Sequence, residues 1–81
     1  MNFSYVYILE NAKTPSHFYV GVTNNLKERL ARHNAAENPS TANLRPWRIK
    51  TAIAFTDRLK AARFERYLKT ASGRAFVKKR L

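Results

Sequence analysis

The chain has 81 residues, a length at which a single domain buries only about 60 % of the surface that its unfolded chain exposes. We therefore expect one domain over residues 1–81, with no large internal ligand cavity. Lysine and arginine number 16 against five aspartate and glutamate residues, which gives a net charge of +11 spread along the chain. A charge of this size favours a polyanionic partner, and nucleic acid is the expected one.

Cysteine is absent, which excludes a disulfide framework and a thiolate metal site. Any metal would be held by oxygen or imidazole ligands, and this points to a hard divalent ion. No apolar run approaches the roughly 20 residues of a membrane span, and residues 1–5 lack the charged region that opens a signal peptide. We expect a cytoplasmic protein that does not associate with membranes.

Two short runs rich in aromatic and β-branched residues, 3–9 and 18–23, are separated by a turn-rich linker. This pattern predicts an antiparallel hairpin. Because side chains alternate along a strand, Tyr5 and Tyr7 lie on one face of the sheet. Tyr19 and Gly21 likewise lie on one face, and the missing side chain of Gly21 leaves room beside a phenol. The arrangement fits either a functional site or ordinary tyrosines half-buried in a small core.

The next run, 24–34, predicts a helix that is capped by Asn25 and carries Leu26 and Leu30 one turn apart. Arg29 and His33 are also four residues apart, so they lie on one helical face beside the leucines. A solvated basic face is the alternative interpretation.

Residues 37–47 are polar and contain two prolines, and they predict an exposed loop that offers the hydroxyls of Ser40 and Thr41. A third strand is expected at 49–55, with one face formed by Ile49, Thr51, Ile53 and Phe55.

Asp57 is suited to cap a helix from 58 to about 70, and Ser72-Gly73 predicts a break before a short basic helix, 74–81. The expected order is β-β-α-β-α-α. We therefore predict an α+β fold in which helices flank a small three-stranded antiparallel sheet.

Glu65 is the informative residue of the second helix, because Ala61, Ala62 and Leu68 lie three or four positions away on the same side. A carboxylate that faces inward needs a partner. An ion pair with Arg29 or another arginine is one possibility. The other is a metal ligand, because Mg²⁺ is commonly held by one or two carboxylates with waters and phosphate oxygens.

Several motifs occur in one order along nearly the whole chain, and together they resemble a GIY-YIG nuclease domain. They are Tyr5-Val6-Tyr7, Tyr19-Val20-Gly21, Arg29 with His33, Pro46-Trp47 before a strand, and Glu65 within its helix. The sequence is most similar to the stand-alone bacterial branch of the superfamily, which is related to the amino-terminal nuclease of the repair excinuclease.

The resemblance implies a metal-dependent endonuclease that cuts DNA in repair, recombination or processing, with one Mg²⁺ or Mn²⁺ held by Glu65. It assigns the catalytic roles to Tyr7, Tyr19, Arg29, His33 and Glu65. In this hypothesis Arg29 stabilises charge on the phosphate, and a tyrosine, Tyr7 in preference to Tyr19, takes a proton from water. Such a role requires that nearby positive charge, with His33 as hydrogen-bond partner, favour the phenolate.

The expected substrate contacts are Gly21, Lys27, Arg32, Ser40, Thr41 and Arg45. The sequence departs from the family pattern at Tyr5, which replaces the glycine of the first motif, and at Phe64, where a basic residue is frequent. A catalytically inactive DNA- or RNA-binding module is the alternative function, although such a module has no need of Glu65, whose charge repels phosphate. Because no second domain supplies specificity, an unidentified protein partner is expected to supply targeting.

Overall fold

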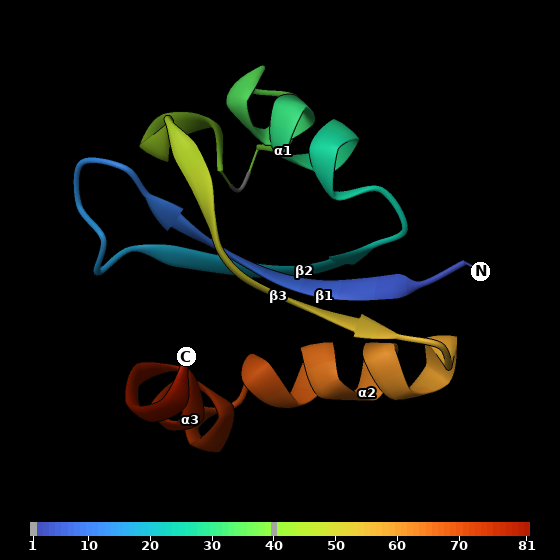
Figure 1. The fold of residues 1–81 in the computed structure, drawn as a ribbon. Coiled ribbons are helices and arrows are strands. Elements are labelled where there is room, and N and C mark those ends of the chain that lie inside the picture. Colours follow the sequence, from blue (N-terminus) through green and yellow to red (C-terminus); the bar gives the residue numbers. More distant parts are fainter. Residues whose placement is uncertain (1, 40) are drawn as a thin grey trace.

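A three-stranded antiparallel sheet lies at the centre of the computed structural model, which describes residues 2–39 and 41–81 (Figure 1). The strand order is β2 (Phe18–Thr23), β1 (Ser4–Asn11), β3 (Trp47–Phe55), so the first strand is the central one. Helix α1 (Leu26–Asn34) covers one face of the sheet, and α2 (Arg58–Leu68) with α3 (Ala71–Arg80) covers the other. The predicted α+β fold with the order β-β-α-β-α-α is confirmed.

Side-chain caps begin each α-helix. The Asn25 side chain accepts from the N–H of Glu28, and the Asp57 side chain accepts from the N–H groups of Leu59 and Lys60, as predicted. The predicted break at Ser72-Gly73 is wrong. Thr70 caps α3 instead, and the helix runs through Gly73, which is buried against the end of α2 where a Cβ would lie 1.9 Å from the Tyr67 carbonyl oxygen. Glycine there permits the two helices to pack closely.

The alternation of side chains along β1 divides the core into two clusters. One cluster, on the α2 and α3 side, consists of Val6, Ile8, Val20, Ala61, Leu68 and Val77. The other, on the α1 side, consists of Tyr7, Leu9 and Trp47, with Tyr19, Leu26 and Leu30 packed against it. The α1 side therefore carries both tyrosines of the predicted site.

A β-bulge in β3 corrects one prediction about this strand. Leu9 of β1 pairs with Ile49, but the preceding Ile8 pairs with Thr51, so one residue, Lys50, is inserted between them. Ile49 therefore lies on the α1 face with Leu9 and is exposed, whereas Thr51, Ile53 and Phe55 lie on the α2 face. The prediction that all four occupy one face is wrong for Ile49.

The described helices are too short and too polar for one of them to span a lipid bilayer.

Candidate active site

Four of the predicted catalytic side chains come together where β1, β2 and α1 meet. Tyr7 lies opposite Gly21 in the hairpin, and Tyr19 lies opposite Leu9, so the two tyrosines are diagonal neighbours on one face. Their ring centroids are 6.4 Å apart. One helical turn brings both Arg29 and His33 over the same rings, as their spacing of four residues predicts.

A chain of hydrogen bonds runs from Tyr7 through His33 into the following loop. The Tyr7 hydroxyl is 3.0 Å from His33 Nε2, and His33 Nδ1 is 2.8 Å from Thr41 Oγ1. The Thr41 hydroxyl in turn donates to the Asn38 carbonyl at 3.3 Å. Since a carbonyl only accepts, Thr41 Oγ1 accepts from Nδ1–H, which leaves Nε2 of a neutral imidazole to accept from Tyr7. These hydrogen bonds thus define the tautomer of His33 and the direction in which each bond is donated, from Tyr7 towards His33 and from His33 towards Thr41.

Thr41 is a correction to the predicted substrate contacts. The side chain is 1 % exposed, and its hydroxyl is taken by His33 rather than offered from an exposed loop. Its carbonyl oxygen also accepts from Trp47 Nε1 at 2.9 Å, which anchors the loop to β3. Thr41 therefore orients the imidazole, while the neighbouring Ser40 lies outside the described residues.

Burial keeps both Tyr7 and His33 neutral. Burial and the charge of Tyr19 raise the pKa of Tyr7 to about 12, although the charge and hydrogen bond of Arg29 act in the opposite direction. Burial, followed by the nearby Arg29 cation, lowers the pKa of His33. The environment therefore does not favour the phenolate that a role of Tyr7 as base requires.

Gly21 lies directly beside the Tyr7 phenol. A Cβ at this position would be 2.3 Å from the Tyr7 hydroxyl oxygen, which is too close for any side chain to fit without movement. Gly21 is buried, so it makes room for Tyr7, and the predicted contact of Gly21 with substrate is not supported.

Tyr19 differs from Tyr7 in its access to solvent. Tyr7 is 1 % exposed, whereas Tyr19 is half-buried at the edge strand β2. The ring of Tyr19 lies 4.9 Å from the imidazole of His33, and its hydroxyl accepts from the Asn38 amide at 3.5 Å. A water or phosphate reaches Tyr19 more readily than Tyr7.

Glu65 lies on α2, on the face of the sheet opposite to the one that carries Tyr7 and Tyr19. Its side chain is 17 % exposed and forms an ion pair with Lys69, one turn further along the helix. Its negative charge is close enough to raise the pKa of Tyr7. Glu65 thus lies away from open solvent, and the ion pair that the structure gives it is with a lysine.

The predicted cationic substrate contacts are exposed, but only some lie near the cluster. Arg29, Arg32 and His33 line one hollow together with residues 37–39. Arg32 also pairs with Glu28 at 2.9 Å in the solvent. Lys27 is exposed on α1, and the Arg45 guanidinium donates to the carbonyl oxygens of Ala42 and Asn34.

Two asparagines that support the site were not predicted. Asn34 at the end of α1 bonds both backbone groups of Trp47, and Asn38 bonds Tyr19. Neither residue has a distinctive spacing, because each pairs with a residue distant in the sequence. Trp47 belongs to a motif that is visible in the sequence, but its hydrogen bond to the Thr41 carbonyl could be found only from the structure.

The fold and the cluster of two tyrosines, an arginine and a histidine define a small α+β nuclease domain. Comparison with known families agrees, because the model of the GIY-YIG catalytic domain matches residues 3–80. The chain belongs to the GIY-YIG family.

Two known proteins are similar to this chain. A protein of Paracoccidioides lutzii (strain ATCC MYA-826 / Pb01) named "Structure-specific endonuclease subunit SLX1" is 36 % identical over 69 residues, which cover 78 % of this chain. The matched part is 16 % of the length of that protein. The solution structure of the UPF0213 protein BH0048 from Bacillus halodurans has a TM-score of 0.56 and 27 % identity, and the match covers 98 % of this chain and 84 % of that one.

Proposed function

We propose that this protein is a divalent-metal-dependent endonuclease that hydrolyses phosphodiester bonds of DNA in repair, recombination or processing. One observation carries the proposal: Tyr7, Tyr19, Arg29 and His33 converge at one hydrogen-bonded site, in which the Tyr7 hydroxyl is 3.0 Å from His33 Nε2. A positively charged chain that only binds DNA also gains nothing from the half-buried carboxylate of Glu65.

Hydrolysis needs charge stabilisation on the phosphate and removal of a proton from the attacking water. Arg29 is suited to the first task, because it lines the hollow beside His33 with its cation near the Tyr7 hydroxyl. For the second task we propose Tyr19, because Tyr7 is buried with its proton donated to His33. Tyr7, His33 and Thr41 then act as positioning residues that hold Arg29 and the ring of Tyr19 in place.

Glu65 fits the single divalent ion that the family implies. One carboxylate together with waters and phosphate oxygens is a common ligand set for Mg²⁺, and Mn²⁺ accepts the same oxygen ligands. Among the described residues no group of three or more histidine, aspartate and glutamate side chains offers a richer site. The ion would supply Lewis-acid stabilisation of the phosphate, and Glu65 would exchange its partner Lys69 for it.

Targeting is the other part of the proposal. The Paracoccidioides relative is named as a subunit of a structure-specific endonuclease, and this chain matches only 16 % of it. We propose that a partner protein directs the nuclease to its DNA, and that both act in the cytoplasm.

The test compares two isosteric changes that each remove one carboxylate, Glu65→Gln and Glu10→Gln. Glu10 pairs with Arg48 at 2.8 Å away from the cluster, so it controls for the change in net charge. Purified proteins are given labelled single-stranded, duplex, flap and branched DNA with Mg²⁺, Mn²⁺ or a chelator. Glu65→Gln should lose cleavage by on the order of 10²-fold or more, while DNA binding is kept or slightly tighter.

A folded Glu65→Gln protein that cuts like the wild type would contradict the metal assignment. The ion pair with Lys69 favours a second candidate, an inactive binding module, because it already neutralises the carboxylate. The binding module becomes the better candidate if neither the wild type nor Glu65→Gln cuts any DNA or RNA form although both bind at low salt. Equal melting temperatures of the two variants exclude damage to the fold.

A further inference from the structure

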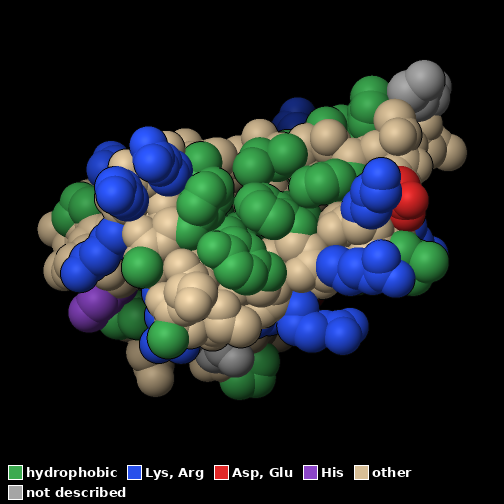
Figure 2. Space-filling model, turned by 90° about the horizontal axis from the view of Figure 1, so that it is seen from below, with side chains coloured by type: hydrophobic (Ala, Val, Ile, Leu, Met, Phe, Trp, Pro, Cys, Tyr) green, Lys and Arg blue, Asp and Glu red, His purple; other side chains and the backbone are tan. Residues whose placement is uncertain are grey.

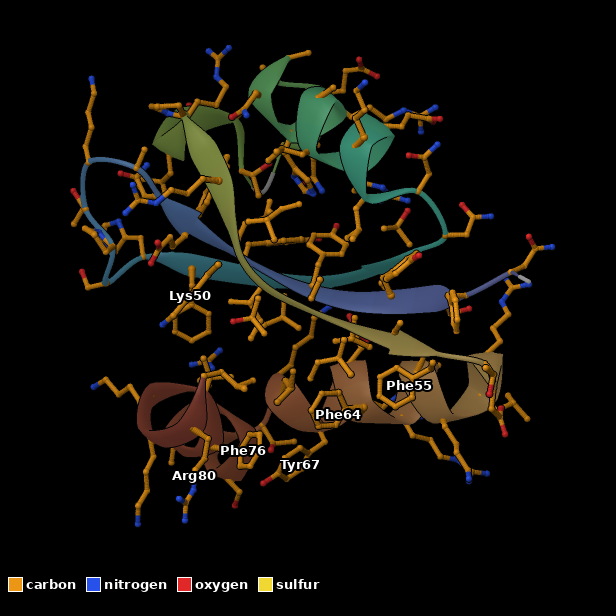
Figure 3. The ribbon with its side chains drawn as sticks, viewed as in Figure 1. Lys50, Phe55, Phe64, Tyr67, Phe76 and Arg80 are labelled. Carbon is orange, nitrogen blue, oxygen red and sulfur yellow. The ribbon has the colours of Figure 1, made fainter. Side chains whose placement is uncertain are left out.

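Four aromatic side chains gather on the side of the sheet away from α1. They are Phe55 of β3, Phe64 and Tyr67 of α2, and Phe76 of α3, and we call them the aromatic surface (Figure 3). The centroid distances are 5.7 Å for Phe55 to Phe64, 6.4 Å for Phe64 to both Tyr67 and Phe76, and 6.2 Å for Tyr67 to Phe76. Three elements that are distant in the sequence thus form one continuous row of rings.

The rings remain partly accessible. Tyr67 is 41 % exposed, and the three phenylalanines pack on the core cluster of this side while part of each faces solvent. Figure 2, which views the molecule from this side, shows hydrophobic side chains continuous over its middle, with lysine and arginine side chains at both ends. Exposed apolar patches with a polar rim typically mark binding sites.

Cations surround the aromatic surface. Lys60 and Arg63 lie one turn before Phe64 and Tyr67 on α2, and Arg80 lies one turn after Phe76 on α3. In Figure 3, Arg80 and Lys50 are found at the end of the row opposite Phe55.

Carboxylates do not balance these cations. The chain has five acidic residues, all within its described part, and the two on or beside α2 are engaged elsewhere. Asp57 caps the start of α2, and Glu65 pairs with Lys69. The aromatic surface therefore combines exposed rings with unbalanced positive charge.

This combination selects among possible occupants. A second copy of the chain would bring a like-charged rim against this one, which is unfavourable. A protein partner would need carboxylates around an apolar centre. A single strand of nucleic acid carries both features in every nucleotide, because the flat base stacks on an aromatic ring while the phosphate pairs with a cation.

We propose that the aromatic surface binds single-stranded nucleic acid, with bases stacked on Tyr67 and Phe64 and phosphates held by the surrounding cations. The inference deepens the proposed function and rests on it, since it names the substrate class: a nucleic acid with a single-stranded arm. The arm lies on the α2 and α3 side of the sheet, whereas Tyr19, Arg29 and His33 lie on the α1 side, so that the strand that is held and the bond that is cut belong to different parts of the substrate.

The experiment measures binding of a fluorescent oligothymidine of about 15 nucleotides, and of a duplex, by anisotropy at low salt. Tyr67→Leu keeps an apolar side chain but removes the ring, so single-strand affinity should fall by about tenfold while duplex affinity is unchanged. The matched control is Leu59→Ser, since Leu59 is 67 % exposed on the same helix but lies outside the aromatic surface. For charge, Arg80→Gln is compared with Lys13→Gln in the linker between β1 and β2.

Photocrosslinking gives an independent readout. An oligonucleotide with 5-iodouracil should crosslink to peptides that contain Tyr67 or Phe64. Wild-type affinity in Tyr67→Leu, or crosslinks confined to β2 and α1, would overturn the inference. A loss in Arg80→Gln without one in Tyr67→Leu would also overturn it, because charge alone would then explain the binding. Single-strand binding without cleavage contradicts the proposed nuclease and not this site, whereas cleavage with an unaffected Tyr67→Leu contradicts this site alone.

Discussion

At the scale of single residues, burial determines what each polar group of the cluster can do. Tyr7 and His33 bond each other at 3.0 Å with almost no exposure, so both are held neutral and in a defined direction. Tyr19 on the neighbouring strand keeps part of its surface in solvent. The two tyrosines, which stand in similar sequence motifs, are therefore suited to different chemical roles.

Phenylalanine substitutions should separate these two roles. Tyr19→Phe should reduce cleavage by on the order of 10²-fold with little change in stability, because it removes the proposed proton acceptor. Tyr7→Phe should instead lower the free energy of unfolding by about 1–3 kcal/mol, because it leaves the buried Nε2 of His33 without a donor. Single-turnover cleavage and urea denaturation measure the two effects. The opposite pattern would make Tyr7 the base.

His33 should make the protein sensitive to mild acid. The folded state lowers the pKa of this imidazole from 6.5, so below that pH the unfolded chain binds a proton that the folded chain does not. The stabilising contribution is complete above pH 6.5 and is lost as the pH falls towards the folded pKa. Urea denaturation should therefore show a lower free energy of unfolding at about pH 5 than at about pH 7.5. His33→Gln should flatten this dependence, whereas His17→Gln, at an exposed position in the linker, should keep it.

At the scale of elements, the position of α1 depends on one asparagine at its end. The Asn34 side chain donates to the Trp47 carbonyl oxygen at 3.0 Å and accepts from the Trp47 N–H at 2.7 Å. It thus ties the helix that carries Arg29 and His33 to the first residue of β3. The packing of α1 on β3 is a consequence of this clamp together with the buried indole.

Asn34→Ala should destabilise the protein by about 2 kcal/mol, because two backbone groups of Trp47 lose their partner in a partly buried place. Cleavage by the folded fraction should also fall, since Arg29 and His33 would no longer be held over the tyrosines. Asn43→Ala, in the exposed 3-10 turn Ala42–Leu44, is the control and should change stability by less than about 0.5 kcal/mol. Thermal and urea denaturation of both variants measure the difference, and equal stability would show that the clamp is dispensable.

At the scale of the whole molecule, a net charge of +11 should dominate the affinity for DNA. Cations lie both around the hollow lined by Arg29, Arg32 and His33 and around the aromatic surface, so many phosphates can be neutralised at once. Counterion release then makes the logarithm of the binding constant fall linearly with the logarithm of salt concentration.

Anisotropy titrations of a duplex between about 50 and 200 mM salt should show a fall in affinity of 10-fold or more. For Glu65→Gln, the slope of the logarithm of the binding constant against the logarithm of salt concentration should equal that of the wild type, because the substitution removes no lysine or arginine. An affinity that stays flat over this range would contradict electrostatic binding.

The sequence by itself determined the local elements and the class of the protein. The residue pattern placed the hairpin and the first two helices, Asn25 and Asp57 marked the starts of these helices, and alternation put Tyr7 on one face with Tyr5 and Tyr19 on one face with Gly21. These features depend on residues a few positions apart, for which the chain has few alternatives. The motifs were then enough to identify the family.

Only the tertiary structure decided which groups meet and which are buried. The bond from Tyr7 to His33 spans 26 positions, the bulge at Lys50 moved Ile49 to the other face, and the loop turned Thr41 inward. The aromatic surface likewise joins a strand and two helices. Such contacts arise from packing between distant elements, whose side chains compete for the same space, and no local pattern along the chain records the outcome of that competition.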